Sequence, residues 1–379
     1  MRKLFKNILS VKLLMASVPG LFLCTSAAFA NNLNLNVTGQ VTTAYDDNIT
    51  DVEKDRLEDF VTNLETGLEL EQKGETHDYS IKGDLIEQIF AAHGNFNNLA
   101  EDFNVSLKQA LSEHDRVAVV DIFKNSTSPS NFQDTFGRSN GLYSTVNNQV
   151  GVSYTHDLNE QLSSELHFGN VINNYSQNNL VSSALYQGGG TITYTHDSAN
   201  IFNLGYDYIR RLFASGPGAT INSILTGFRH YFTSQIYTDI DAGPDFINTY
   251  TDKNIIEPHY KASVTDQIDQ NNSVGLTFEK EVTSDPYDQD LFNSWRTSLN
   301  LFRQFSVRLS GNMNVFYGQG RYDHLNLNED LTGIQTQVNY ALTQKTQLSV
   351  GYTYTNSASN SIGNAFRKNY FYVIFSFKF

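Results

Sequence analysis

Ionisable and amide side chains recur at every second position in many stretches of this 379-residue chain, and the positions between them are largely apolar. An alternating pattern puts polar side chains on one face of an extended strand and apolar ones on the other. Such a polar face can hydrogen-bond water and polar solutes. The candidate lining residues are Glu65, Glu69, Lys82, Asp84, Lys108, Glu165, His167, Asp207, Arg211, Asp239, Asp241, Glu257, His259, Lys261, Glu279, Glu281, Arg296, Arg308, Gln335 and Gln337, with Asn312, Asn314 and Asn339 on the same face.

The pattern does not have the spacing of a catalytic or metal site. The nine histidines are scattered along the chain. His77, His114, His156 and His196 all fall beside predicted turns. No Ser/His/Asp triad and no zinc-ligand spacing stands out in the sequence. We therefore predict that the protein is not an enzyme, and we expect no catalytic residue, no bound metal and no cofactor.

An acidic stretch follows the first predicted strand. Oxygen ligands at this density could bind a divalent cation, but the glycine and the terminal glutamate of an EF-hand loop are missing. A surface run of charges gives the same composition. The sequence favours the surface run, and metal binding is the alternative. The stretch consists of Tyr45-Asp46-Asp47-Asn48, Asp51, Glu53, Asp55, Glu58 and Asp59.

The last ten residues form the clearest of the strands that must position these side chains. One face is wholly apolar, and the chain ends on it: Phe371, Val373, Phe375, Phe377 and Phe379. An exposed aromatic edge would promote aggregation of a soluble sheet, whereas a barrel closed in lipid has no edge. The segment resembles the C-terminal signature of bacterial outer-membrane β-barrels, so we predict that these five residues form an assembly signal. A buried last strand of a soluble sandwich is the alternative.

The first thirty residues have the pattern of a secretory signal peptide. Basic residues precede an apolar run over 13–23, and Ala28-Phe29-Ala30 offers a cleavage site. We expect residues 1–30 to be removed and 31–379 to form one domain. The single cysteine, Cys24, would leave with the signal, so no disulfide is expected. The formal charge of −14 becomes more negative without the basic leader, which argues against nucleic acid as a partner.

Composition and repetition predict the fold. The chain has 21 Tyr and 26 Phe but one Trp, as expected where strands are polar on one face and aromatic at two membrane interfaces. Tight polar turns recur, with two strand-like runs of about 10 to 13 residues between them, long enough to cross a bilayer at a tilt. We predict an all-β, antiparallel, up-and-down transmembrane barrel of about 18 strands, with short periplasmic turns and longer extracellular loops. The turns lie near Lys73-Gly74, Glu113-His114, Asp157-Leu158-Asn159, Asp197-Ser198-Ala199, Thr233-Ser234, Ile268-Asp269-Gln270, Gln304 and Thr343-Gln344-Lys345.

Two regions carry further expectations. The strand after the Gln304 turn is expected to begin at Phe305, which would put Arg308 on the polar face. The third outer loop, from Lys124 to about Ser144, is the longest, and its order and length resemble those of the loop that folds into the channel of general porins. A plain solvated loop remains open as the alternative. Its candidate contact residues are Phe132, Asp134, Phe136 and Arg138.

From Tyr45-Asp46-Asp47-Asn48-Ile49 to Phe379, the chain resembles the family called putative β-barrel porin 2. The length, the strand count and the C-terminus carry this resemblance together. It implies an outer-membrane channel and, since members are often linked to it, export of exopolysaccharide or capsule. No functional residue follows from it, because the family has no catalytic pattern to match.

A barrel of this width is too wide for side chains to fill, so it should hold a water-filled, porin-like channel. Polysaccharide export or sugar passage is the expected role, in the outer membrane of a Gram-negative cell. The alternative is a structural or surface-interaction barrel with an occluded lumen. The expected partners are outer-membrane lipid and lipopolysaccharide, the barrel-assembly machinery through the C-terminal strand, and a separate polysaccharide-export protein.

Overall fold

The computed structural model describes residues 33–127, 142–176, 180–216, 218–249, 253–284, 290–322, 326–360 and 365–379. No helix in these ranges is long and apolar enough to cross a membrane. The strands are β1 Leu33–Asp46, β2 Asp59–Lys73, β3 His77–Phe90, β4 Asn98–Ala110, β5 Asp115–Ser126, β6 Thr145–Asp157, β7 Leu162–Tyr175, β8 Ser183–Thr195, β9 Asn200–Phe213, β10 Ala219–Tyr231, β11 Ile236–Asn248, β12 Asn254–Asp269, β13 Asn272–Ser284, β14 Leu291–Ser306, β15 Leu309–Tyr322, β16 Leu327–Ala341, β17 Thr346–Ser359 and β18 Phe366–Lys378, with a short 3-10 helix η2 Gly94–Phe96 between β3 and β4.

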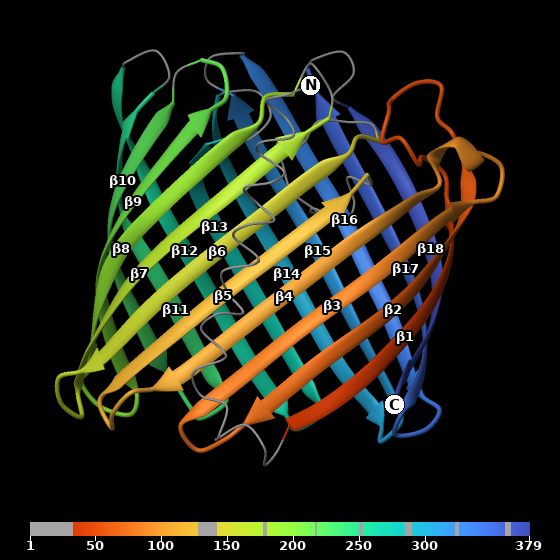
Figure 1. The fold of residues 1–379 in the computed structure, drawn as a ribbon. Helices are drawn as coiled ribbons and strands as arrows, with labels where there is room; N and C mark the ends of the chain where they lie inside the picture. Colours follow the sequence, from red (N-terminus) through yellow and green to blue (C-terminus); the bar gives the residue numbers. More distant parts are fainter. Residues whose placement is uncertain are drawn as a thin grey trace, which may run out of the picture.

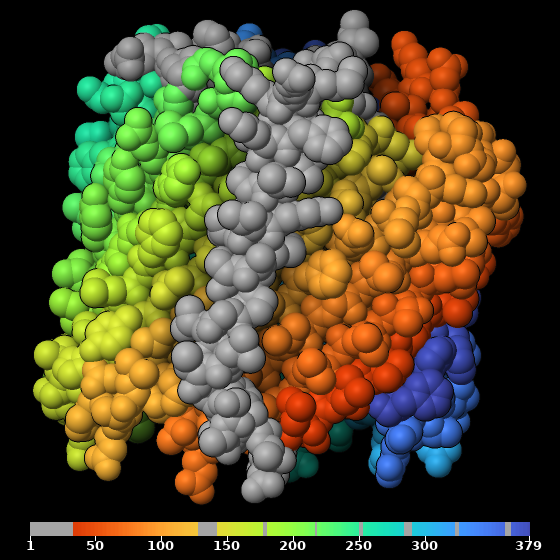
Figure 2. Space-filling view, viewed as in Figure 1, coloured from red at the N-terminus to blue at the C-terminus, as the bar shows by residue number. Residues whose placement is uncertain are grey.

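The strands form one closed antiparallel barrel. Each pairs with its sequence neighbours in an 18-stranded sheet, and β1 also pairs with β18, which closes the wall. The strands are strongly tilted (Figure 1). Successive strands cover the outer surface as diagonal bands (Figure 2). Closure gives every strand a neighbour on both sides, so no strand lies at a free edge of the sheet. The predicted fold class and strand count are confirmed.

The tight turns are built from side chains that cap the backbone. In the turn after β8, Asp197 Oδ1 accepts the N–H groups of Ala199 and Asn200, both at 2.8 Å. The N–H of Ala199 and the Asn200 side chain hold the pKa of the Asp197 carboxyl below its usual range. Asp, Asn, Ser and Thr favour this arrangement because their side-chain oxygen accepts the backbone N–H in place of a backbone carbonyl. The same pair of bonds recurs at Ser112, Asn159, Thr233, Ser306 and Thr343.

The predicted start of the strand after the Gln304 turn is wrong. The strand β14 continues to Ser306, and β15 begins at Leu309 rather than at Phe305. The Ser306 hydroxyl accepts the N–H groups of Arg308 and Leu309. Arg308 therefore lies in the turn, at the periplasmic end of the wall, and not on the face of a strand.

Strand register separates an outer from an inner face. Val41 lies directly opposite both Leu64 and Phe375, and all three side chains are at least 39% exposed. Residues opposite each other share a face, so this assignment passes from strand to strand around the barrel. The outer face is mostly apolar, as expected of a lipid-facing surface, and Asp121, opposite Val105 and Val150, is an exception. At the β1–β18 seam, the Phe377 ring fills the space over Gly39, where an added Cβ would lie 2.1 Å from the ring.

Candidate channel and its constriction

The inner face carries the candidate lining residues. Gln40 lies opposite Glu65, Glu69 opposite Lys82, and Asp241 opposite Lys261. Continuing this register around the closed sheet places every candidate residue that lies in a strand on the face opposite to the apolar one. Arg308 lies in the turn between β14 and β15 and lines the periplasmic end of the lumen. The strands thus bring together residues that are distant in sequence.

Several charges on this face are paired. The Lys82 ammonium lies 2.7 Å from Asp84. Nε2 of His167 on β7 lies 2.6 Å from Oδ1 of Asp207 on β9, with β8 between the two strands. The Arg229 guanidinium donates two hydrogen bonds to Asp239. Neighbouring charges of opposite sign largely cancel each other's electric field. The inner wall is therefore hydrated and carries both signs of charge, without one strong field.

One row of the wall alternates in sign across four strands. Asp241 on β11 lies opposite Lys261 on β12, which lies opposite Glu279 on β13, which in turn lies opposite Arg296 on β14. The Arg296 guanidinium also covers the Phe316 ring, 4.3 Å from its centroid. A solute passing this row meets both signs of charge in succession.

The extracellular end of the β13–β14 hairpin leaves the wall. Pairing between β12 and β13 ends at Tyr260 and Lys280, whereas β13 stays paired with β14 as far as Ser284 and Leu291. The register gives Val282 and Leu291 the outward orientation, yet both are buried. They can be buried only if the outer side of the hairpin packs against another part of the chain.

The packing partner is a row of isoleucines on the inner face of the neighbouring strands. Ile209, Ile221, Ile247 and Ile255 lie directly opposite one another on β9 to β12. Val282 and Leu291 belong to one apolar cluster with Ile221, Ile247 and Ala219, which Ile209 and Ile255 flank. On the outside of β12, Ile256 remains 67% exposed. The hairpin end therefore lies inside the lumen, across β10 to β12, and narrows the channel.

A lysine holds the hairpin where it leaves the wall. The Lys280 ammonium donates to the side-chain oxygen of Asn293 at 3.0 Å, to the carbonyl of Pro258 at 3.3 Å and to Glu257 at 3.4 Å. Pro258 has no N–H to offer a neighbouring strand, so separating the strands here costs less ladder bonding than elsewhere. The alternating pattern alone did not predict this constriction, although isoleucines on an otherwise polar face were a usable signal.

The acidic stretch after β1 folds into the extracellular mouth. Glu53, Asp55 and Glu58 are exposed, as expected for a surface run of charges, but the prediction is wrong for four other residues of the stretch. Asp46, Asn48, Asp51 and Asp59 are all buried. The Lys368 ammonium lies 2.8 Å from Asp46 and 3.1 Å from Asp51. Asp46 and Asp51 can be buried because the Lys368 cation on β18 lies against both. The buried Asp59 carboxylate instead accepts the N–H groups of Ala92 and His93.

Asn48 fixes the loop to the barrel seam. Its side-chain amide donates to the carbonyls of Val52 and Arg367 and accepts the Val52 N–H. Asp47 accepts hydrogen bonds from the backbone N–H and the side-chain amide of Asn369. The Asp-Asp-Asn motif therefore ties β1 to β18. No group of three or more His, Cys, Asp or Glu side chains in the described ranges is arranged to hold a metal ion.

The predicted inward fold of the third outer loop stays a prediction. Residues 128–141, which include Phe132, Asp134, Phe136 and Arg138, lie outside the described part of the chain. The loops after β1 and β3 contribute another apolar contact at the mouth. Ile49, Val61 and Phe90 pack together there, with Leu57 and Phe96 against them. Val61 and Phe90 come from the inner face, so these loops also lean over the lumen.

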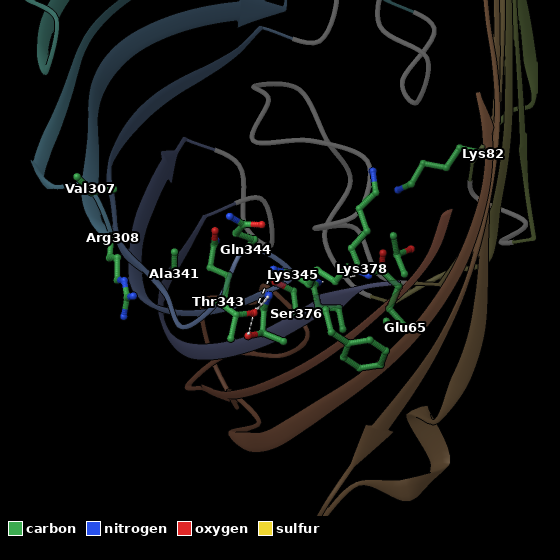
Figure 3. Close-up of a pocket in the computed structure, with 16 residues that line it drawn as sticks. Glu65, Lys82, Val307, Arg308, Ala341, Thr343, Gln344, Lys345, Ser376 and Lys378 are labelled. Carbon is green, nitrogen blue, oxygen red and sulfur yellow. Dashed lines mark hydrogen bonds between the residues drawn. The ribbon is translucent and has the colours of Figure 1, made fainter. Parts of the chain in front are cut away.

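A cavity of about 750 Å³ occupies the periplasmic end of the lumen near the seam. The turn with Thr343 and Lys345 borders it, and the Lys82 and Lys378 side chains extend into the same space (Figure 3). The Lys378 ammonium lies 3.6 Å from Glu69. The cavity is open and polar, which suits hydrated solutes better than a buried apolar ligand.

Residues 253–379 match the family model described as putative beta-barrel porin 2. The predicted resemblance to this family is confirmed over that part of the chain. The putative beta-barrel porin 2 match runs from β12 to the C-terminus, so it includes the constricting hairpin and Lys368. The search of curated proteins gave no match.

Solved structures of outer-membrane barrels share the fold. OccAB4 of Acinetobacter baumannii is 11% identical, with a TM-score of 0.52 over 92% of this chain and 99% of that one. OccK5 (OpdH) of Pseudomonas aeruginosa is 11% identical, with a TM-score of 0.51 over 91% and 98%. The siderophore receptor PirA of A. baumannii is 7% identical, with a TM-score of 0.52 over 92% and 81%. The chain therefore has the fold of an outer-membrane β-barrel.

Proposed function

We propose that this barrel forms a water-filled channel for neutral or weakly charged, hydroxyl-rich solutes. The observation that carries the proposal is the polar inner face of a closed 18-stranded wall. Side chains cannot fill a barrel of that width, so the lumen holds water. Mixed, paired charges exclude neither sign strongly, and a neutral solute meets no electrostatic barrier there.

The inward hairpin and the loop after β1, residues 47–58 and here called the seam loop, narrow the channel near the extracellular mouth. A constriction of this kind sorts solutes by size while the wider periplasmic cavity stays open. The same packing also favours the second candidate function, a structural barrel with an occluded lumen. Conductance of the purified barrel in a planar bilayer distinguishes the two.

We expect an open channel with a mild cation preference that fades as the salt concentration rises. Two inner carboxylates, Asp241 and Glu279, make no ion pair within 4 Å among the described residues. Their field is screened beyond about 10 Å in 0.1 M salt. The reversal potential across a KCl gradient measures the preference. A barrel that never conducts would favour the occluded alternative, and strong anion selectivity would contradict the assigned lining.

We expect Val282→Asp to widen the channel. A carboxylate at this position would be buried in the isoleucine cluster without a partner, which is strongly unfavourable, so the hairpin end should detach. The expected result is a clear rise in single-channel conductance. Thr283→Asp is the matched control, because the adjacent Thr283 is exposed. Equal conductance of both variants would show that the cluster does not hold a constriction.

Export of a polysaccharide is a narrower form of this proposal. It takes up the expectation that the family resemblance implies, and a lumen suited to hydroxyl-rich chains supports it. In this form residues 1–30 direct export of the chain, the C-terminal strand engages the assembly machinery, lipopolysaccharide surrounds the outer rim, and a separate protein delivers the polymer. Accumulation of periplasmic polymer in a deletion strain would support this role, and unchanged surface polymer would oppose it.

A further inference from the structure

Charged side chains are unevenly distributed around the inner wall. The inner positions of β11 to β13 include Asp239, Asp245, Glu257 and Glu281 besides the alternating row. On β15, β16 and β17, by contrast, Glu329 near the extracellular end is the one charged residue at the inner positions of the described strands. The inner wall formed by β15, β16 and β17 is therefore nearly neutral.

Amides occupy much of that neutral wall. They form a compact group on two adjacent strands, in which Asn314 lies opposite Gln335 and Asn312 lies opposite Gln337. Asn339 continues the row along β16. These five residues, Asn312, Asn314, Gln335, Gln337 and Asn339, are here called the amide strip. Asn312 is exposed, and the other four are half-buried.

Hydrogen bonds orient the strip without using all of its groups. Asn339 Oδ1 accepts from Gln337 at 2.5 Å and from the Ser349 hydroxyl at 2.7 Å, and the Tyr372 hydroxyl donates to Gln337 at 3.1 Å. The Tyr372 ring reaches this position because it lies over Gly351, where an added Cβ would be 2.2 Å from the ring. Each amide has several donor and acceptor sites, so most keep some directed at the lumen.

The chemistry of the strip suits an uncharged chain of hydroxyl groups. An amide can donate to one hydroxyl and accept from its neighbour, and no charged group has to lose its hydration when the ligand binds. Alternate residues of a strand repeat every 6 to 7 Å or so. The three amides of β16 therefore offer successive pairs of hydrogen bonds along the direction of transport.

We propose that the amide strip is a binding track for neutral oligosaccharides. The inference rests on the proposed channel function and adds a location and a ligand class to it. A uniform hydrated wall would pass the same solutes without binding them. The difference between the two is measurable as a sugar-dependent block of the ion current.

Maltohexaose, a neutral linear glucan, is a suitable probe for planar-bilayer recordings of the full chain. The wild-type channel should show a saturable block. Asn312→Leu combined with Gln335→Leu should weaken the apparent affinity about tenfold, because two hydrogen-bonding side chains are lost from the strip. The matched control is Asn104→Leu combined with Gln187→Leu, two inner amides on β4 and β8, which should change the affinity less than about twofold.

The outcomes separate the inference from the channel function. A wild-type barrel that conducts without any sugar block would overturn the binding track and leave the channel standing. Equal loss of affinity in the test and control variants would also overturn it. A folded barrel shows heat-modifiable mobility and sugar-free conductance, and if the double variant lacks either, Asn312→Leu alone is tested. That exposed position should still weaken binding severalfold, and unchanged binding would contradict the proposal.

Discussion

Replacing Phe375, Phe377 and Phe379 together by Ser should abolish assembly of the barrel. These side chains lie on the outer face of β18, the strand that pairs with both β17 and β1. Phe377 packs over Gly39, and the Phe379 N–H donates to the carbonyl of Val37. Burying each large apolar side chain is worth about 1.5 to 3 kcal/mol. The triple change therefore removes much of what closes the wall.

The readout is the amount of heat-modifiable protein in the outer membrane, which we expect to fall below detection. Ser376→Ala is the matched control. Ser376 lies between Phe375 and Phe377 in the sequence, but its side chain is on the inner face. It should assemble at the normal level. Normal insertion of the triple variant would mean that β18 closes the barrel without its apolar face, contrary to the predicted assembly signal.

Lys368→Met should destabilise the barrel by about 3 to 5 kcal/mol, the usual effect of removing one partner from a buried ion pair. The largely buried Lys368 ammonium faces Asp46 and Asp51. Methionine keeps the length of the side chain but leaves two buried carboxylates without that cation. The free energy of unfolding in guanidinium chloride measures the loss.

Two further variants make this result specific. Lys345→Met changes an exposed lysine in a periplasmic turn and should leave the stability within about 0.5 kcal/mol of wild type. Adding Asp46→Asn and Asp51→Asn to Lys368→Met should recover a large part of the loss, since the buried charges are then gone. If neutralising the carboxylates gave no recovery, the ion pairs would not be what holds the seam loop.

The sequence by itself determined the strands, the turns and the two faces. Residues such as Asp197 and Thr343 cap a turn from within four positions, so local sequence is enough to place it. Alternation assigned Glu65 and Lys82 to the polar face and Phe375 to the apolar one, because side chains of a strand point to opposite sides. A closed barrel preserves this local rule wherever a strand stays paired with both of its neighbours.

Tertiary structure alone decided where the wall departs from that rule. Val282 follows the outward pattern of β13, but the hairpin bends inward because a row of isoleucines from β9 to β12 offers an apolar surface inside the lumen. Asp51 is buried because Lys368, more than three hundred residues away, neutralises it. Both contacts join residues far apart in sequence, and neither follows from a pattern within one strand. The physical reason is that burial of an apolar or charged group depends on its partner, which only the closed barrel brings into place.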